Sequence, residues 1–268
     1  MAEEKSRRVF IGVGHGGSDP GAVKYIKEAD ANLQMALGLK SELERHGVTV
    51  GISRLKDEDD PLTEEIKEAN AFAPDVAVEC HNNASGSTNG ADGFEVYHQT
   101  NGYAAQSRRL AQCIEARVVA SGQQSRGVKT RLNGSGTDYF GWCRQVKAPA
   151  VLCEGFFVDN LVDSSDYNTA AKQQAFGRVY AWGVLDYLGI AVQPQDSGWY
   201  TVQVGAFVSA QNAQRLADQL KERGYFVQLH HGSLVRVCVG RFGTQAEARQ
   251  TAQDLSKKGF GGLVKVCG

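Results

Sequence analysis

Two histidines and two glutamates stand beside short apolar segments in the first two thirds of the chain. His15, His81 and Glu154 each follow such a segment, and Glu28 lies just before a helical pattern. The carboxyl ends of parallel strands meet at one edge of an α/β sheet, where sites commonly form. Catalytic zinc is often held by two histidines and one glutamate, with a further position left for water. The four residues predict metal-assisted hydrolysis, with His15, Glu28 and His81 as ligands and Glu154 as the base.

The spacing of these residues contains no local metal-binding motif. The successive intervals are 13, 53 and 73 residues, so a pattern such as H-E-x-x-H is absent. A structural role is the alternative for a histidine at a strand end, and the prediction depends on whether the fold gathers the four side chains.

A glycine-rich loop surrounds the first histidine. Residues 12–17 satisfy G-x-G-x-x-G directly after a strand, which raises the possibility of a dinucleotide site. That site also needs a helix to open onto the pyrophosphate, and Pro20 with Gly21 opposes a helix there. The pattern is therefore interpreted as a loop that presents His15.

Apolar runs alternate with helical patterns through this part of the chain, which predicts an α/β fold with a mostly parallel twisted sheet flanked by helices. Strands are expected at 9–13, 48–53, 76–80, 94–98 and 150–154, helices at 31–46, 62–72, 103–121 and 168–188, and a polar loop region at 122–141.

The charge of the chain is balanced in total and uneven along its length. Of 268 residues, 29 are Lys or Arg and 30 are Asp or Glu, and this net charge of -1 argues against a nucleic-acid binder. Residues 1–196 carry a net charge of -6 and residues 197–268 a net charge of +5. We expect a domain at 1–192, a linker at 193–198 and a second domain at 199–268.

The second domain is expected to be a small α+β unit of ferredoxin-like order, β-α-β-β-α-β. Its strands are predicted at 199–204, 226–229, 234–239 and 263–266, and its helices at 210–223 and 245–257.

The spacing of the cysteines and the hydropathy of the chain indicate the cellular compartment in which it is made. The six cysteines lie far apart, which favours buried free thiols over a zinc ribbon or a disulfide scaffold. No apolar stretch is long enough for an integral membrane segment, and residues 1–13 lack a classical export signal. We expect synthesis in the cytoplasm without a signal peptide.

Residues 9–188 resemble the zinc-dependent N-acetylmuramoyl-L-alanine amidases of the type-3 family, found in bacterial autolysins and phage endolysins. The matching blocks are VFIGVGHGGSDPGA at 9–22, KEADANL at 27–33, the AN and HNN segments within 69–83, GFEVY at 93–97, RGVK at 126–129 and PAVLCEGFFVDN at 149–160. Glu65 departs from the pattern, since many relatives have an arginine near that position.

The resemblance implies the same four residues, with His15, Glu28 and His81 as Zn²⁺ ligands and Glu154 as the catalytic glutamate. It also implies cleavage of the amide between the lactyl group of N-acetylmuramic acid and the L-alanine of the stem peptide. Arg126, Lys129 and Asn82 are then candidate substrate contacts. For Arg126 and Lys129 the alternative is that they are solvated surface residues of a loop.

Residues 199–267 resemble the SPOR domain, a sporulation-related module that binds the cell wall. YTVQVGAF at 200–207 and VRVCVGRF at 235–242 carry this resemblance. It implies that the partner is peptidoglycan, as glycan strands stripped of stem peptides. Gln203, Phe207, Arg236 and Arg241 are the candidate glycan contacts, and alternation along the strands places Gln203 and Arg236 on the sheet face that the helices leave open.

Two alternatives to the amidase stay open. One is a zinc peptidase that cuts within the stem peptide, and the other is a cell-wall-binding protein without catalysis. For the amidase, the missing export signal predicts action on the wall after release by lysis of a phage host or of a spore mother cell.

Overall fold

The computed structural model describes residues 6–192, 199–230, 234–242 and 245–267. The chain divides into two compact units, Met1–Val192 and Gln193–Gly268. The expected linker, 193–198, lies outside the described residues. Within the described part, no helix combines the length and apolar character that crossing a membrane requires.

The first unit is built on a six-stranded sheet with the strand order β2-β1-β3-β6-β4-β5. All neighbouring strands are parallel except β4 and β6, which run antiparallel. This arrangement confirms the predicted mostly parallel α/β fold. The strands are β1 (Arg8–Val13), β2 (Thr49–Ile52), β3 (Val76–Asn83), β4 (Phe94–His98), β5 (Ser125–Lys129) and β6 (Ala150–Phe157).

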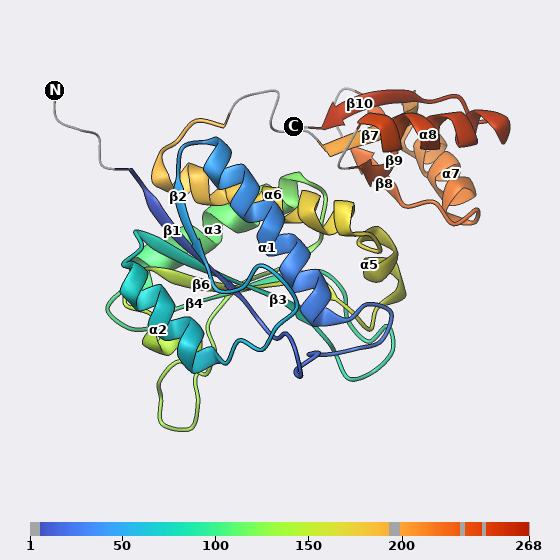
Figure 1. Ribbon diagram of the computed structural model, residues 1–268. Helices are drawn as coiled ribbons and strands as arrows, with labels where there is room; N and C mark the ends of the chain where they lie inside the picture. The colour runs from blue at the N-terminus through green and yellow to red at the C-terminus, as the bar shows by residue number, and fades with distance from the viewer. Residues whose placement is uncertain (1–5, 193–198, 231–233, 243–244, 268) are drawn as a thin grey trace, which may run out of the picture. The chain divides into compact units, whose positions relative to one another are not determined.

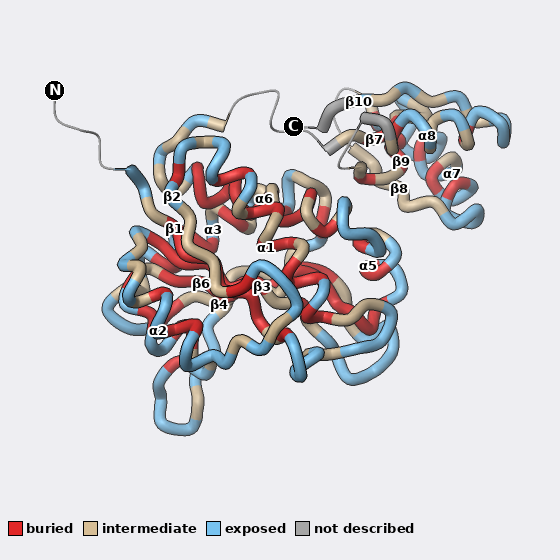
Figure 2. The backbone as a smooth tube through the Cα atoms, in the orientation of Figure 1, coloured by how far each residue is buried: buried red, intermediate tan, exposed pale blue. Residues whose placement is uncertain are grey.

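Helices cover both faces of this sheet (Figure 1). They are α1 (Glu28–Arg45), α2 (Leu62–Phe72), α3 (Ala104–Ala120), α4 (Gly141–Gln145), α5 (Leu161–Asp166) and α6 (Ala170–Leu188). α6 packs against both α1 and α3 on one face. On the opposite face, Ile66 of α2 and Trp142 of α4 join Phe10 and Ala77 of the sheet in one apolar cluster. The central strands β1, β3 and β6 are accordingly buried from two sides, as the red segments in Figure 2 show.

Two glycines set the close approach of α1 and α6. A Cβ atom on Gly177 would lie 1.8 Å from the carbonyl oxygen of Met35, and one on Gly38 would lie 2.0 Å from that of Gln174. Any larger residue would therefore push the helices apart. Because α1 carries Glu28 at its first turn, this packing also fixes the position of that carboxylate.

The elements differ from the expected ones in ways that affect the site. β3 and β6 run past their predicted ends, so His81 and Glu154 lie within strands, and α1 begins at Glu28 itself. The region 122–141, expected to be a loop, contains β5. This strand lies at the sheet edge, is only partly buried and includes Gly127, so its sequence lacks the apolar run of a central strand.

The second unit has the predicted β-α-β-β-α-β order. It consists of β7 (Trp199–Phe207), α7 (Ala210–Lys221), β8 (Val227–His230), β9 (Val235–Phe242), α8 (Gln245–Lys257) and β10 (Leu263–Cys267). The strands form an antiparallel sheet in the order β10-β7-β9-β8. Val202, Val237 and Val239 pack with Ala213 and Leu220 of α7 in its core, as the alternation of the strands predicts.

Candidate metal centre and active site

His15 lies in the loop after β1 and has a left-handed backbone, with φ of 62°. A residue other than glycine in this region is strained by about 1–3 kcal/mol, which the surrounding contacts must offset. Gly16, Gly17 and Gly21 also have positive φ, so this loop needs its glycines for its path. The loop aims the imidazole of His15 at Glu28, with Nε2 3.3 Å from Oε2.

Glu28 is the first residue of α1 and is 4% exposed. Its Oε2 accepts a hydrogen bond from the backbone N–H of Ala22 (3.0 Å), and its Oε1 accepts one from that of Asn82 (3.1 Å). Burial works to raise the pKa of this carboxyl, but hydrogen bonds from His15 and His81 outweigh burial and hold the pKa well below its usual range. Glu28 is therefore an ionised carboxylate held between two imidazoles.

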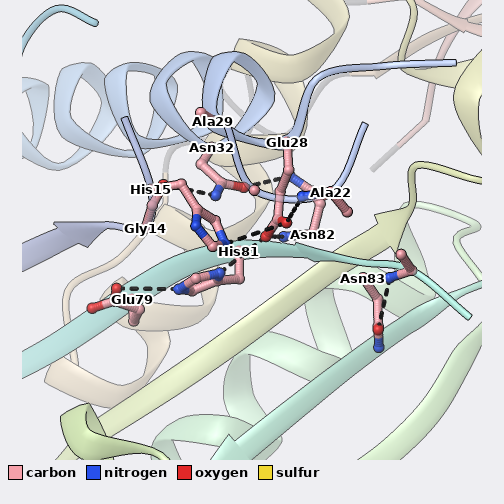
Figure 3. Close-up of polar contacts among 12 residues, drawn as sticks. Gly14, His15, Ala22, Glu28, Ala29, Asn32, Glu79, His81, Asn82 and Asn83 are labelled. Atoms are coloured by element: carbon pink, nitrogen blue, oxygen red, sulfur yellow. Dashed lines mark hydrogen bonds and ion pairs between the residues drawn. The ribbon is translucent and has the colours of Figure 1, made fainter. Parts of the chain in front are cut away.

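His81 approaches the other oxygen of this carboxylate, with Nδ1 3.0 Å from Oε1 (Figure 3). Its ring lies edge-on to that of His15, with 4.9 Å between centroids. A Cβ on Gly14 would lie 2.2 Å from the His81 ring, so this glycine provides the space that the ring occupies. The structure thus gathers His15, Glu28 and His81 in one place.

The donor set fits a metal ion. One ligand atom from each of the three residues lies within 4.8 Å of the other two. Two neutral imidazole nitrogens and one carboxylate oxygen match the catalytic zinc set in number and type. In the metal-free protein, hydrogen bonding to Glu28 raises the pKa of His15, and carboxylates outweigh burial to raise that of His81. A metal ion and protons therefore compete for these rings.

Glu154 of β6 is the register partner of His81 of β3. Side chains of paired residues on adjacent parallel strands point to the same face, so Glu154 stands beside the cluster. Burial raises the pKa of Glu154 to about 7. Its Oε2 is buried and has no hydrogen-bond partner among the described residues. A carboxyl group with one oxygen free of structural partners in the described part, and with a pKa near neutrality, is suited to general-base work.

Arg126 and Lys129, two of the candidate substrate contacts, both bind Glu95 of β4. Arg126 Nε hydrogen-bonds to Glu95 Oε1, and Lys129 Nζ lies 2.9 Å from the same oxygen. Glu95 is itself the register partner of Glu154. The two cations therefore line the region next to the proposed base, already paired with a carboxylate that the sequence analysis did not single out.

Asn82, the third candidate, has a different role from the one expected. Its side chain is 2% exposed, donates to Asn32 Oδ1 (2.8 Å) and accepts from the backbone N–H of Phe156 (3.2 Å). Asn32 in turn donates to the carbonyl of Gly14 (2.9 Å). Alternation along β3 sends Asn82 to the face opposite His81. Asn82 thus supports the site from behind and has no surface for substrate.

Buried residues to which the sequence analysis gave no role lie around the site. Arg54 is 2% exposed and donates to the carbonyls of Val13 (3.1 Å), Gly14 (3.3 Å) and Ala29 (2.9 Å), which fixes both ends of the His15 loop. Glu65 and Glu79 are buried beside a cavity of about 380 Å³ that reaches His15 and His81. No local pattern marks these residues, because their partners are distant in sequence.

The candidate glycan contacts of the second unit separate into two pairs. Arg236 is exposed on β9, and Gln203 is half-buried on β7. Arg241, in contrast, is 7% exposed and lies over the Phe226 ring, while Phe207 packs against the apolar core.

A register shift accounts for the position of Phe207. The register between β7 and β9 shifts between Gln203 and Gly205, and the extra residue reverses the alternation that starts from Gln203, which directs Phe207 away from the open face. Arg241 has the same parity as Val235, Val237 and Val239, which pack in the core, so regular alternation along β9 does not place it on the open face either. The expectation for these two residues is corrected accordingly.

The fold and the site together define a hydrolase of the mixed α/β class, with a His-Glu-His cluster at the carboxyl edge of a mostly parallel sheet. The family model described as N-acetylmuramoyl-L-alanine amidase (Amidase_3) matches residues 9–186, and the chain belongs to this family. The SPOR domain model matches residues 196–265. These matches confirm the predictions of peptidoglycan amidase function and of a cell-wall-binding module.

Known proteins resemble the chain over much of its length. It is 31% identical over 221 residues to the sporulation-specific N-acetylmuramoyl-L-alanine amidase of Bacillus subtilis (strain 168), which covers 81% of this chain and 82% of the relative. It is 34% identical over 187 residues to the endolysin of Bacillus phage SPP1, and this match covers 69% of this chain and 67% of the endolysin. The solved catalytic domain of CwlV, an N-acetylmuramoyl-L-alanine amidase from Bacillus (Paenibacillus) polymyxa var. colistinus, matches with a TM-score of 0.61 and 28% identity, over 69% of this chain and 99% of that domain.

Proposed function

We propose that the first unit is a zinc-dependent amidase in which His15, Glu28 and His81 hold the metal and Glu154 is the general base. The observation that carries this proposal is the convergence of the three ligand atoms within 4.8 Å, next to a partly buried glutamate in register with His81. The bond cleaved is the amide between the lactyl group of N-acetylmuramic acid and L-alanine.

The residues of the chain divide the chemistry between them. A bound zinc ion supplies the Lewis acid that polarises the scissile carbonyl and activates water. Glu154 accepts the proton of the attacking water and returns it to the nitrogen of the leaving amine. Hydrolysis then yields a lactyl carboxyl group and a stem peptide with a free amino terminus. Glu95 holds Arg126 and Lys129 beside Glu154, where they partly offset the charge of the carboxylates.

Digestion of purified cell-wall sacculi tests the proposal. Intact stem peptides with free N-terminal L-alanine, together with unsubstituted muramic acid, are expected by mass spectrometry. Fragments that lack L-alanine would identify a peptidase within the stem peptide, and the absence of any product would identify a protein that only binds the wall. Chelation should abolish the activity and added zinc should restore it.

The variant Glu154→Gln tests the base, with Glu64→Gln as the matched control. Glu64 is exposed on α2 and pairs only with Lys67 among the described residues. Activity should fall about 10²–10⁴-fold in the first variant and persist in the second. If lysis survives both chelation and Glu154→Gln, the proposed mechanism is wrong.

We also propose that the second unit binds glycan strands without stem peptides, through the face that carries Arg236 and Gln203. Its net positive charge favours an anionic polymer. The Glu154→Gln chain should co-sediment more strongly with sacculi stripped of peptides by another amidase than with untreated sacculi. Arg236→Ala should reduce this binding, and equal binding to both substrates would contradict the denuded-glycan proposal.

A further inference from the structure

Glu79 lies two residues before His81 on β3 and points to the same face of the sheet. It is 1% exposed, and its Oε1 is 3.4 Å from Nε2 of His81 (Figure 3). Its other oxygen, Oε2, is buried with no hydrogen-bond partner among the described residues. His81 is thus the one polar contact that the described structure gives this buried carboxylate.

Both imidazoles of the cluster are held in the same way, each between two carboxylates. His81 directs Nδ1 to Glu28 (3.0 Å) and Nε2 to Glu79. His15 directs Nε2 to Glu28 (3.3 Å) and Nδ1 to Asp19 (2.8 Å). The two outer partners differ in their surroundings, because the side chain of Asp19 is 65% exposed and that of Glu79 is 1% exposed. Water screens the first pair and hardly reaches the second.

The adjacent strand leaves room for this carboxylate. Gly12 of β1 is the register partner of Glu79, and a Cβ on Gly12 would lie 2.1 Å from Glu79 Oε2. The same Cβ would lie 2.9 Å from Oε1 of Glu65. Glu65 has other partners, since its Oε1 accepts from the backbone N–H of Val13 (2.7 Å) and the hydroxyl of Ser53 (2.9 Å).

A role in stability alone does not account for Glu79. A buried carboxylate beside a second buried carboxylate, with one oxygen unpartnered, costs free energy of folding. An apolar or amide side chain of similar size would fill the same space without this cost. The feature that distinguishes the carboxylate is the contact with His81.

We propose that Glu79 is a positioning residue for the metal centre. Its carboxylate accepts the Nε2–H of His81, which leaves Nδ1 as the free donor atom and fixes the ring plane toward Glu28 and the metal. Carboxylates that hold a ligating histidine in this way raise its basicity and metal affinity about 10–100-fold in other metal sites. This inference rests on the proposed zinc site.

The experiment measures the zinc dissociation constant of the full chain by competition with a chromophoric chelator. Glu79→Ala should weaken zinc binding about 10–100-fold relative to the parent chain. Glu79→Gln, which keeps an acceptor without the charge, should give a smaller loss. Gly12→Ala keeps Glu79 but displaces its carboxylate, and should weaken binding as well. Gly12 does not have a positive φ, so alanine fits its backbone conformation.

Glu65→Gln is the matched control. It removes an equally buried carboxyl from the same cavity while leaving the Glu79 to His81 contact in place, so zinc affinity should stay within about twofold of the parent. The Tm of the metal-free protein gives a second readout. It should not fall below that of the parent in Glu79→Gln, because the amide removes the cost of the buried carboxylate, whereas a residue needed for the fold would lower it.

The outcomes separate the inference from the proposed function. Zinc binding by the parent chain with unchanged affinity in Glu79→Ala and Gly12→Ala would overturn the inference alone. An equal loss of zinc affinity in Glu65→Gln would also overturn the inference, since the removal of any buried carboxylate beside the cavity would then weaken zinc binding. If Glu79→Ala does not fold, the zinc affinities of Glu79→Gln and Gly12→Ala are compared with that of the parent instead. A parent chain that binds no zinc would overturn both the inference and the proposed metal centre.

Discussion

Substitution of Gly14 by alanine tests the geometry of the metal centre directly. The added Cβ would lie 2.2 Å from Cε1 and Nε2 of His81, whereas carbon atoms in ordinary contact are about 3.5–4.0 Å apart. The overlap is therefore about 1.3 Å or more. Gly14 does not have a positive φ, so the backbone conformation itself accepts alanine.

The ring of His81 must move in this variant, because hydrogen bonds hold the backbone of Gly14 in place. The N–H of Gly14 donates to the carbonyl of Cys80 (3.1 Å), and the carbonyl of Gly14 accepts from Asn32 (2.9 Å) and Arg54 (3.3 Å). A functional metal site tolerates ligand displacements of only about 0.2 Å. We expect zinc affinity to fall by about 100-fold or more, beyond the loss of an outer hydrogen-bond partner. Overpacking should also cost the metal-free fold about 1–3 kcal/mol.

Zinc titration and denaturant unfolding of the metal-free chain measure the two effects. Gly102→Ala is the control, since a Cβ on this exposed turn glycine meets no atom within 4 Å and its φ is not positive. That variant should match the parent in both assays. Parental zinc affinity in Gly14→Ala would refute the assignment of His81 as a ligand held against this glycine.

Three further variants probe the base, the helix packing and the cation pair. Glu154→Gln should lower amidase activity about 10²–10⁴-fold while zinc binding measured by titration is retained, because the base is not a ligand. Gly177→Ala should lower the free energy of unfolding by about 1–3 kcal/mol in denaturant titration, since its Cβ would meet the Met35 carbonyl at 1.8 Å; an unchanged midpoint would contradict the close α1 to α6 packing. Burial works to raise the pKa of Glu95, but Lys129, Arg126 and Tyr97 outweigh it and lower the pKa. The stability that Glu95 contributes is therefore present above about pH 4.5 and lost as the pH falls through its folded-state pKa. Glu95→Gln should accordingly be less stable than the parent at pH 7, with a smaller difference at pH 3.5, and a difference that grows with acid would show that the pairing is misassigned.

The cluster was predictable because each member follows a simple local rule. His15, His81 and Glu154 stand at or near the carboxyl ends of strands, and parallel strands bring these ends to one edge. Glu28 stands at the first turn of the following helix, close to the same edge. Strand positions and parallel order are enough to place these four residues together.

The face of the sheet to which a side chain points was harder to predict than the position of its strand in the sequence. Asn82 was selected because it adjoins His81, although the two-residue period of a strand sends neighbours to opposite faces. Phe207 has the parity of Gln203, but the register shift between Gln203 and Gly205 interrupts the alternation between them. Such a shift depends on pairing between strands distant in sequence, and no pattern within one strand reveals it.

The partners of the charged residues could not be predicted from the sequence either. Arg126 and Lys129 appeared as two free cations, and their common partner Glu95 lies on a neighbouring strand. Arg54 binds three backbone carbonyls from β1, its loop and α1, contacts that exist only after the chain has folded. Such residues show no spacing or composition signal, because what defines them is a set of long-range contacts.

The glycines at 12 and 14 have a consequence for the family's variation. Gly12 faces Glu79 and Gly14 faces His81, so β1 and the residue that follows it leave empty volume that side chains of β3 fill. The volume available at positions 12 and 79 is therefore shared between two strands. We expect relatives that carry a side chain at position 12 to have a smaller residue than glutamate at position 79, so that the two positions change together during evolution.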